Sequence, residues 1–184
     1  MLVVAVCEPL SVPRARAGED DAWNVLFQRY QLPLYVYVFE LLHDEQAGLD
    51  VVQETFISAV RHVGTLRDDA KFGSWLFGIA HQKCIQRWRR RDRETLALED
   101  IAGTPPAFEE GPAGLLIRQE QEAQFMQLLN QLPLPQRSVL LLHFVEEFSL
   151  QEIADITGAQ LGTVKSRMHY AKKALRKLLE DQAP

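Results

Sequence analysis

The chain has 184 residues, and its 20 lysines and arginines against 25 aspartates and glutamates leave a formal net charge of −5. This length suits one domain or two small ones, and a hydrophobic share of 47% excludes a disordered chain. An acidic total argues at first against a nucleic-acid partner, although a net charge averages over the surface whereas recognition depends on local patches.

Apolar residues recur at three- and four-residue steps from Trp23 to Leu42, which predicts a helix. Pro33 interrupts this stripe, so we expect either a kink or two consecutive helices there. Similar spacing predicts a second helix from Leu49 to Val63 and a third from about Phe72 into the arginine run. No convincing run alternates as a strand does, so the predicted class is all-α.

A change in composition divides the chain in two. Six glycines and prolines and five acidic residues, with no lysine or arginine, lie between Glu94 and Ile117. Such a stretch predicts a flexible linker, although a structured inter-domain loop remains an alternative. We therefore expect an N-terminal extension of unknown role at 1–18, helical domains at 19–93 and 119–184, and a linker at 94–118.

The positive charges gather in two places. The segment from Lys83 to Arg93 carries a net +5 and the segment from Ile156 to Leu179 carries +6, which leaves −16 for the remainder. Basic residues can simply complement a helix dipole or form a solvated face. The local patterns therefore have to decide whether these two segments bind nucleic acid.

The second basic segment follows the pattern of a helix-turn-helix. Ser149 and Glu152 are spaced as a capping box that opens a short helix, and Gly158 suits the turn after it. Thr163 is placed to cap a second helix that is apolar on its inner face and basic outside. This arrangement predicts a duplex-DNA reader; a helical hairpin that binds only protein is the alternative.

The first domain carries an acidic motif and an aromatic one. Asp50 and Glu54 lie four residues apart, on one face of the predicted helix, which makes either a solvated face or a docking surface for a partner. Aromatic residues from Phe72 to Trp88 interleave with the first basic segment, as in proteins that bind single-stranded nucleic acid. Phe72 and Trp75 could instead be plain core residues, which is the commoner role for aromatics at this spacing.

These motifs together resemble the extracytoplasmic-function (ECF) sigma factors of bacterial RNA polymerase. The resemblance rests on Asp50 to Phe56, on Phe72 to Leu76 with the arginines to Arg93, and on the segments Leu132 to Leu142, Ser149 to Ala154 and Gly162 to Arg167. It covers about residues 21–179. It implies a protein that binds the β and β′ subunits of core polymerase and directs them to promoter DNA, and it makes an anti-sigma factor a plausible partner.

The resemblance also implies a role for particular residues. A surface for the β′ subunit would include Asp50, Gln53, Glu54 and Thr55. The melted minus-ten element would be held by Lys71, Phe72, Trp75, Gln82, Lys83, Gln86, Arg87, Trp88, Arg89 and Arg90. The duplex minus-thirty-five element would be contacted by Ser149, Thr163, Lys165, Ser166, Arg167, His169, Lys172, Lys173 and Arg176.

The sequence departs from the family pattern at Gly73, where arginine is common, and at Gln82 and Gln86, where asparagine and aspartate are common. These departures put the minus-ten preference in doubt. Two other functions stay open: a helix-turn-helix regulator that binds only duplex DNA, and a helical protein-interaction module.

The sequence suggests neither an enzyme nor a membrane protein. We find no catalytic constellation, and the two cysteines, Cys7 and Cys84, lie far apart and in no metal-ligand spacing, so neither a metal nor a cofactor is expected. No run approaches the ~20 apolar residues of a membrane span, and the apolar start is too short for a signal peptide. A cytoplasmic protein without membrane insertion is expected.

Overall fold

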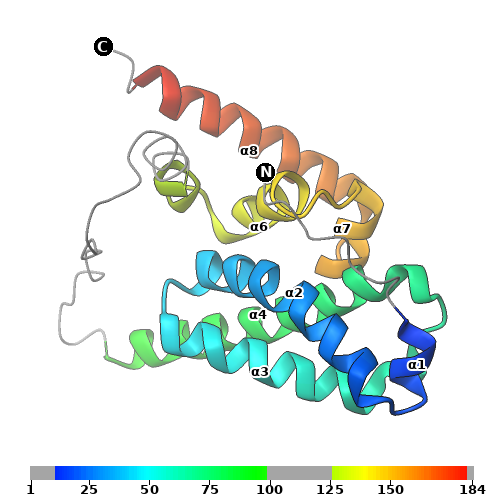
Figure 1. Cartoon of the computed structure of the whole chain (residues 1–184). Helices are drawn as coiled ribbons and strands as arrows, with labels where there is room; N and C mark the ends of the chain where they lie inside the picture. Colours follow the sequence, from blue (N-terminus) through cyan, green and yellow to red (C-terminus); the bar gives the residue numbers. More distant parts are fainter. Residues whose placement is uncertain (1–10, 99–125, 182–184) are drawn as a thin grey trace, which may run out of the picture.

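The computed structural model describes residues 11–98 and 126–181, with side chains to residue 90 in the first range. Both ranges are helical and neither contains a strand, so the predicted all-α class is confirmed. Most of the predicted linker, and the chain before Ser11, lie outside these ranges. Figure 1 shows helices α6 to α8 of the second domain lying over α2 and α4 of the first.

The first domain comprises α1 (Val12–Arg16), α2 (Asp20–Leu42), α3 (Glu45–His62), the short 3-10 helices η1 (Val63–Thr65) and η2 (Asp69–Lys71), and α4 (Phe72–Leu98). Pro33 lies inside α2, so the alternative of two consecutive helices is wrong. Helix α4 runs to Leu98, which takes it five residues past the boundary predicted at Arg93.

Helix α1 falls within residues 1–18, which were predicted as an extension of unknown role. Its residues Val12 and Ala15 are each only 2% exposed. The indole nitrogen of Trp23 on α2 donates a hydrogen bond to the Ala15 carbonyl over 2.9 Å. The chain from Val12 onward is therefore part of the first domain's core.

The described part of the second domain comprises helical residues 126–130, α6 (Leu134–Phe144), α7 (Leu150–Thr157) and α8 (Leu161–Asp181). The capping box is confirmed: the Glu152 amide donates to the Ser149 hydroxyl, and the Ser149 amide donates to the Glu152 carboxylate. Gly158 has a φ of 64°, as the predicted turn requires. Helix α8 begins at Leu161, so the prediction that Thr163 caps it is wrong.

The two domains pack against each other, with α7 on α4 and α6 on α2. The rings of Phe77 and Phe148 meet edge to face across this interface, 5.2 Å apart. A side chain at Gly78 would meet the backbone of Ile156, with its Cβ 3.8 Å from the Ile156 Cα. The buried residues of both domains therefore form one continuous cluster.

Buried polar groups also lie where the domains meet. Arg137 of α6 is 7% exposed, and one of its terminal nitrogens lies 2.6 Å from His43 Nε2, at the end of α2. The Tyr37 hydroxyl of α2 and His81 Nδ1 of α4 share a hydrogen bond of 2.7 Å. Burial, helped by the charge of Arg167 on α8, lowers the pKa of His81 to about 4, so this imidazole is neutral at physiological pH.

Glu146 links the stability of this packing to pH. Its carboxylate lies close enough to α2 to act on the Tyr30 and Tyr37 hydroxyls, and burial raises its pKa to about 7. A pKa raised by folding gives stability that is present below the ordinary value near 4.5 and is lost as the pH rises through 7.

Glu146→Gln removes the cost of burying an ionised carboxylate. We therefore expect the variant to be more stable than the wild type at pH 8 by up to about 3 kcal/mol, at about 1.4 kcal/mol per pKa unit. At pH 5 the expected difference falls below about 1 kcal/mol. Urea unfolding at the two pH values measures both differences. An equal effect at pH 5 and pH 8 would mean that this carboxylate does not titrate differently in the folded chain.

None of the helices within the described ranges is both long and apolar enough to cross a membrane.

Candidate functional site

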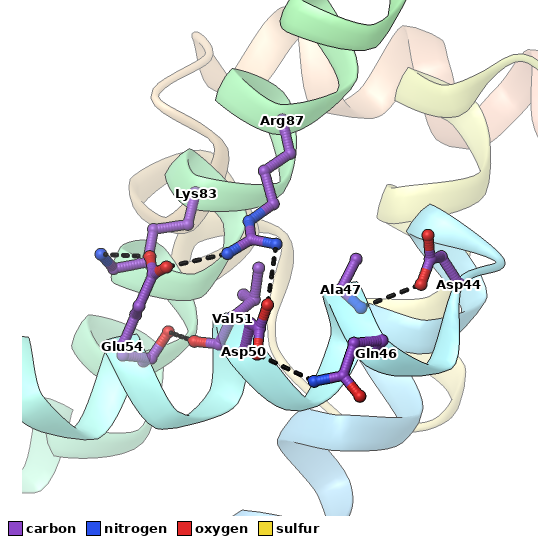
Figure 2. Close-up of polar contacts among 9 residues, drawn as sticks. Asp44, Gln46, Ala47, Asp50, Val51, Glu54, Lys83 and Arg87 are labelled. Atoms are coloured by element: carbon purple, nitrogen blue, oxygen red, sulfur yellow. Dashed lines mark hydrogen bonds and ion pairs between the residues drawn. The ribbon is translucent and has the colours of Figure 1, made fainter.

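The predicted polymerase-binding and promoter-binding residues meet across α3 and α4. Arg87 of α4 lies between two carboxylates of α3, 2.8 Å from Glu54 and 3.7 Å from Asp50 (Figure 2). Lys83, one turn earlier on α4, lies 3.3 Å from the same Glu54. Two residues predicted for the β′ surface therefore form ion pairs with two residues predicted for the minus-ten element.

These ion pairs lower the pKa of Glu54, although its side chain stays about half exposed. Burial, the largest single influence, raises its pKa, but the hydrogen bonds and charges of Arg87 and Lys83 together lower it below the usual value. The side chains of Glu54 and Asp50 remain 48% and 45% exposed. Glu54 is therefore ionised at neutral pH, and both carboxylates can still reach a partner from solvent.

Gln53 lies beside a hollow on the other side of α3. The hollow has a volume of about 620 Å³ between α2 and α3, and its lining includes the half-exposed side chains of Phe27, Leu32, Leu49 and Ile57. The exposed amide of Gln53 stands at its edge. An apolar hollow with polar residues along one side is a common form of protein-binding surface.

The prediction that Thr55 contacts the polymerase is wrong for this conformation. Its side chain is 0% exposed, and its hydroxyl donates to the Val51 carbonyl over 2.6 Å. Helix α3 packs against both α2 and α4, so its buried stripe is wide enough to include this threonine.

The prediction that Phe72 contacts the minus-ten strand is also wrong for this conformation. It is 1% exposed and packs among the rings of Trp23, Tyr30 and Trp75 at centroid distances of 5.5 to 6.3 Å. A residue enclosed in this way cannot stack on a base, so the plain core interpretation applies to Phe72. Trp75 is only half-buried.

Part of the predicted minus-ten surface faces the second domain. Lys71, Trp75 and Gln82 line a hollow of about 390 Å³ between α4 and α7, together with Asp155 of α7. The Lys71 ammonium lies 3.9 Å from the Asp155 carboxylate. In this arrangement the acidic side chain of Asp155 lies beside a lysine that was predicted to contact DNA.

Further along α4 the predicted residues are more open. Trp88 is 43% exposed, and the exposed side chains around it belong to Gln86, Arg89 and Arg90. Exposure of a large aromatic among cations agrees with a role in stacking on bases.

The structure explains why glycine stands at position 73, where the family commonly has arginine. A Cβ at this position would lie 3.1 Å from the Tyr30 hydroxyl and 3.3 Å from the nearest ring carbon. Tyr30 therefore occupies the space that a larger residue would need. Any side chain at position 73 would have to move this ring.

Helix α8 presents the predicted duplex-binding face. Thr163 lies in its first turn, and the exposed side chains along it include Lys165, Ser166, His169, Lys172, Lys173 and Arg176. The Lys172 ammonium lies over the Phe144 ring at 5.3 Å, which anchors it to α6. Arg167 is half-buried, and its charge acts on His81 of the first domain. The hydroxyl of exposed Ser149 is engaged in the cap of α7.

Tyr170 is a surface residue that the sequence-based prediction omitted. It lies on α8 between His169 and Ala171 and is 59% exposed, the highest value among the large hydrophobic side chains of the described ranges. Its position three and four residues after Arg167 and Ser166, on the basic face, was the signal that could have identified it.

No group of three or more histidine, cysteine, aspartate or glutamate side chains that could hold a metal ion occurs in the part of the chain that the structure describes. Cys84 is buried, and burial raises the pKa of its thiol to about 12.

Two family models match the chain, one in each domain. Sigma-70 region 2 matches residues 26–94, and Sigma-70, region 4 matches residues 122–175. The first match covers most of α2 together with α3 and α4, and the second covers α6, α7 and most of α8. Helix α1 lies outside both matches.

Whole-chain relatives agree with these matches. The RNA polymerase sigma-H factor of Pseudomonas aeruginosa is 33% identical over 177 residues, which cover 92% of this chain and 92% of that protein. The ECF RNA polymerase sigma factor SigW of Bacillus subtilis is 29% identical over 178 residues, covering 92% and 95%.

Solved structures show the same fold. The sigma factor RpoE of Bartonella quintana, solved in complex with the anti-sigma factor NepR, superimposes with a TM-score of 0.69 at 25% identity, covering 85% of this chain and 96% of that one. CnrH, solved with the cytosolic domain of CnrY, also gives a TM-score of 0.69, at 22% identity and with coverage of 94% and 96%. The chain therefore belongs to the ECF sigma factors, the subunits that bind core RNA polymerase and direct it to promoters to initiate transcription.

Proposed function

We propose that this sigma factor uses three surfaces. The acidic edge of α3, with Asp50, Gln53 and Glu54, binds the β′ subunit of core polymerase. The exposed part of α4 around Trp88 holds the melted minus-ten strand. The basic face of α8 binds the duplex minus-thirty-five element.

The observation that carries this proposal is the basic face of α8, which is the second helix of a helix-turn-helix whose first helix, α7, has a complete capping box. The capping box and the left-handed Gly158 define where α7 begins and ends. The cations of α8 point away from its buried residues Val164, Met168 and Ala171. A helix mounted in this way can enter the major groove with its basic face toward the DNA.

The distance between the promoter elements requires the domains to separate. Elements named minus-ten and minus-thirty-five lie roughly 25 base pairs apart, or about 85 Å at about 3.4 Å per base pair. A compact chain of 184 residues has a radius of gyration of about 16 Å and a diameter near 40 Å. The 27 residues from 99 to 125 have a contour length of about 90 Å, which is long enough to connect separated domains.

The packed arrangement is therefore an inactive form, in which α7 covers part of the promoter-binding face of α4. An anti-sigma factor that stabilises it would keep the protein off the polymerase. The complex of RpoE with NepR supports this kind of partner. The β subunit would bind the helices around α6, and we infer a cytoplasmic protein that is not an enzyme and needs no cofactor.

Run-off transcription with purified core polymerase tests the proposal. We expect transcripts that start at defined positions on cognate promoters only when the protein is added. A helix-turn-helix regulator of duplex DNA would bind such templates without giving core polymerase a start site, and a protein-interaction module would do neither. Absence of a promoter-directed transcript from any cognate template would refute the proposed function.

A further inference from the structure

The loop between α3 and α4 is attached to the N-terminal helix α1. This loop, from Thr65 to Lys71, precedes the helix that we propose to hold the minus-ten strand. Its two ends are shaped by local hydrogen bonds: the Thr65 hydroxyl donates to the His62 carbonyl over 2.7 Å, and the Ala70 amide donates to Asp68 Oδ1 over 3.0 Å.

The middle of the loop is held by a residue about fifty positions earlier in the chain. Arg16, the last residue of α1, donates from Nη2 to the Leu66 carbonyl over 3.0 Å and to Asp69 Oδ1 over 2.5 Å. One guanidinium thus ties together two loop residues three positions apart. The pair is only about one-third exposed on each side, so water does not fully screen it.

Helix α1 is attached to the core of the first domain. Val12 and Ala15 are buried, and Trp23 donates to the Ala15 carbonyl. The anchor is therefore part of the core, whereas the loop that it holds lies at the surface. Movement of α1 away from the core would release Leu66 and Asp69 together.

We infer that Arg16 is a positioning residue for capture of the melted minus-ten strand. It holds the loop in the shape that leads into Lys71 and α4, and it neutralises Asp69, whose carboxylate would otherwise repel the phosphates of that strand. The inference rests on the proposed role of α4 in holding this strand. It assigns a promoter-related function to a helix outside both family matches.

The test uses the full-length protein bound to core polymerase. The probe is a synthetic oligonucleotide with the non-template strand of the minus-ten region, taken from a promoter that this holoenzyme transcribes. For Arg16→Ala we expect about tenfold weaker binding of this strand, because a charge-assisted contact is lost and Asp69 is left unpaired. Affinity for core polymerase and for a duplex minus-thirty-five fragment should not change.

Arg14→Ala is the matched control. Arg14 lies on the same helix, and its guanidinium pairs with Glu19, 2.6 Å away. We expect it to bind the strand as the wild type does. Arg16→Lys keeps the charge but not the planar guanidinium whose Nη2 donates to both acceptors, so it should recover part of the lost affinity.

The outcomes separate this inference from the proposed function. If the wild-type holoenzyme does not bind the minus-ten strand above a scrambled sequence, the proposed role of α4 fails and this inference fails with it. If the wild type binds but Arg16→Ala binds equally well, only the positioning role is overturned. A parallel loss of thermal stability and core affinity in Arg16→Ala would show a purely structural role, and would overturn it too.

Discussion

Cross-linking η2, directly before α4, to α7 is expected to reduce promoter-directed transcription to the level seen without the protein. Lys71 and Asp155 lie on opposite sides of the interface, with their charged atoms 3.9 Å apart and their side chains 55% and 52% exposed. A Lys71→Cys, Asp155→Cys variant can therefore be joined by a short bis-maleimide linker that contains a disulfide. Transcription should return when a reductant cleaves the linker.

The reason for this large effect is geometric. A linked molecule keeps its two DNA-binding domains within a diameter of about 40 Å, whereas the promoter elements are about 85 Å apart. Cleavage leaves the same chemical remnants on both cysteines, so the linked and cleaved proteins differ only in the connection between the domains.

The natural thiols can be kept out of the reaction. Burial protects Cys84, whose raised pKa also makes its thiol unreactive at neutral pH. Cys7→Ser removes the other thiol. Equal transcription from the linked and cleaved proteins would show that the packed arrangement is itself active.

Local interactions account for what was predictable from the sequence. The capping box of α7 needs only Ser149 and Glu152, three residues apart, and the turn needs only a glycine at position 158. The periodicity of α3 and α4 likewise lies within each helix. Such features depend little on the rest of the fold, so they were identified correctly.

Two of the incorrect predictions, for Thr55 and Phe72, concern contacts between distant segments. Thr55 stands beside the exposed Gln53 and Glu54 but is buried, because α3 packs on two neighbouring helices and its hydroxyl bonds within the helix. The burial of Phe72 depends on Trp23 and Tyr30, more than 40 residues earlier. Local sequence alone does not decide between a buried and an exposed side chain at either position.

The ion pairs between α3 and α4 were not predicted for the same reason, because they join residues that lie far apart in the sequence. Arg87 lies 37 residues after Asp50, and no periodicity relates them. The sequence suggested two independent charged surfaces, whereas the structure places them in contact (Figure 2). The pairing therefore raises the question of whether the carboxylates serve the polymerase or simply hold α4.

Replacing both carboxylates, in Asp50→Ala with Glu54→Ala, should weaken binding to core polymerase at least tenfold. A carboxylate that meets a cation in a protein interface typically contributes 2 kcal/mol or more when its partner is left unpaired, and about 1.4 kcal/mol corresponds to tenfold. Thermal stability should hardly change, because ion pairs this exposed typically contribute less than about 1 kcal/mol. Competition binding without DNA measures the affinity, and thermal unfolding measures the stability.

Arg87→Ala provides the matched control, because it breaks both of the ion pairs that Arg87 makes with Asp50 and Glu54 but leaves the carboxylates in place. If the carboxylates contact the polymerase, Arg87→Ala should bind core polymerase at least as tightly as the wild type, since it frees two acceptors. If they act only by holding α4 against α3, Arg87→Ala should lose as much affinity as the double alanine variant. The comparison depends on core binding alone, so the proposed contact of Arg87 with promoter DNA does not affect it.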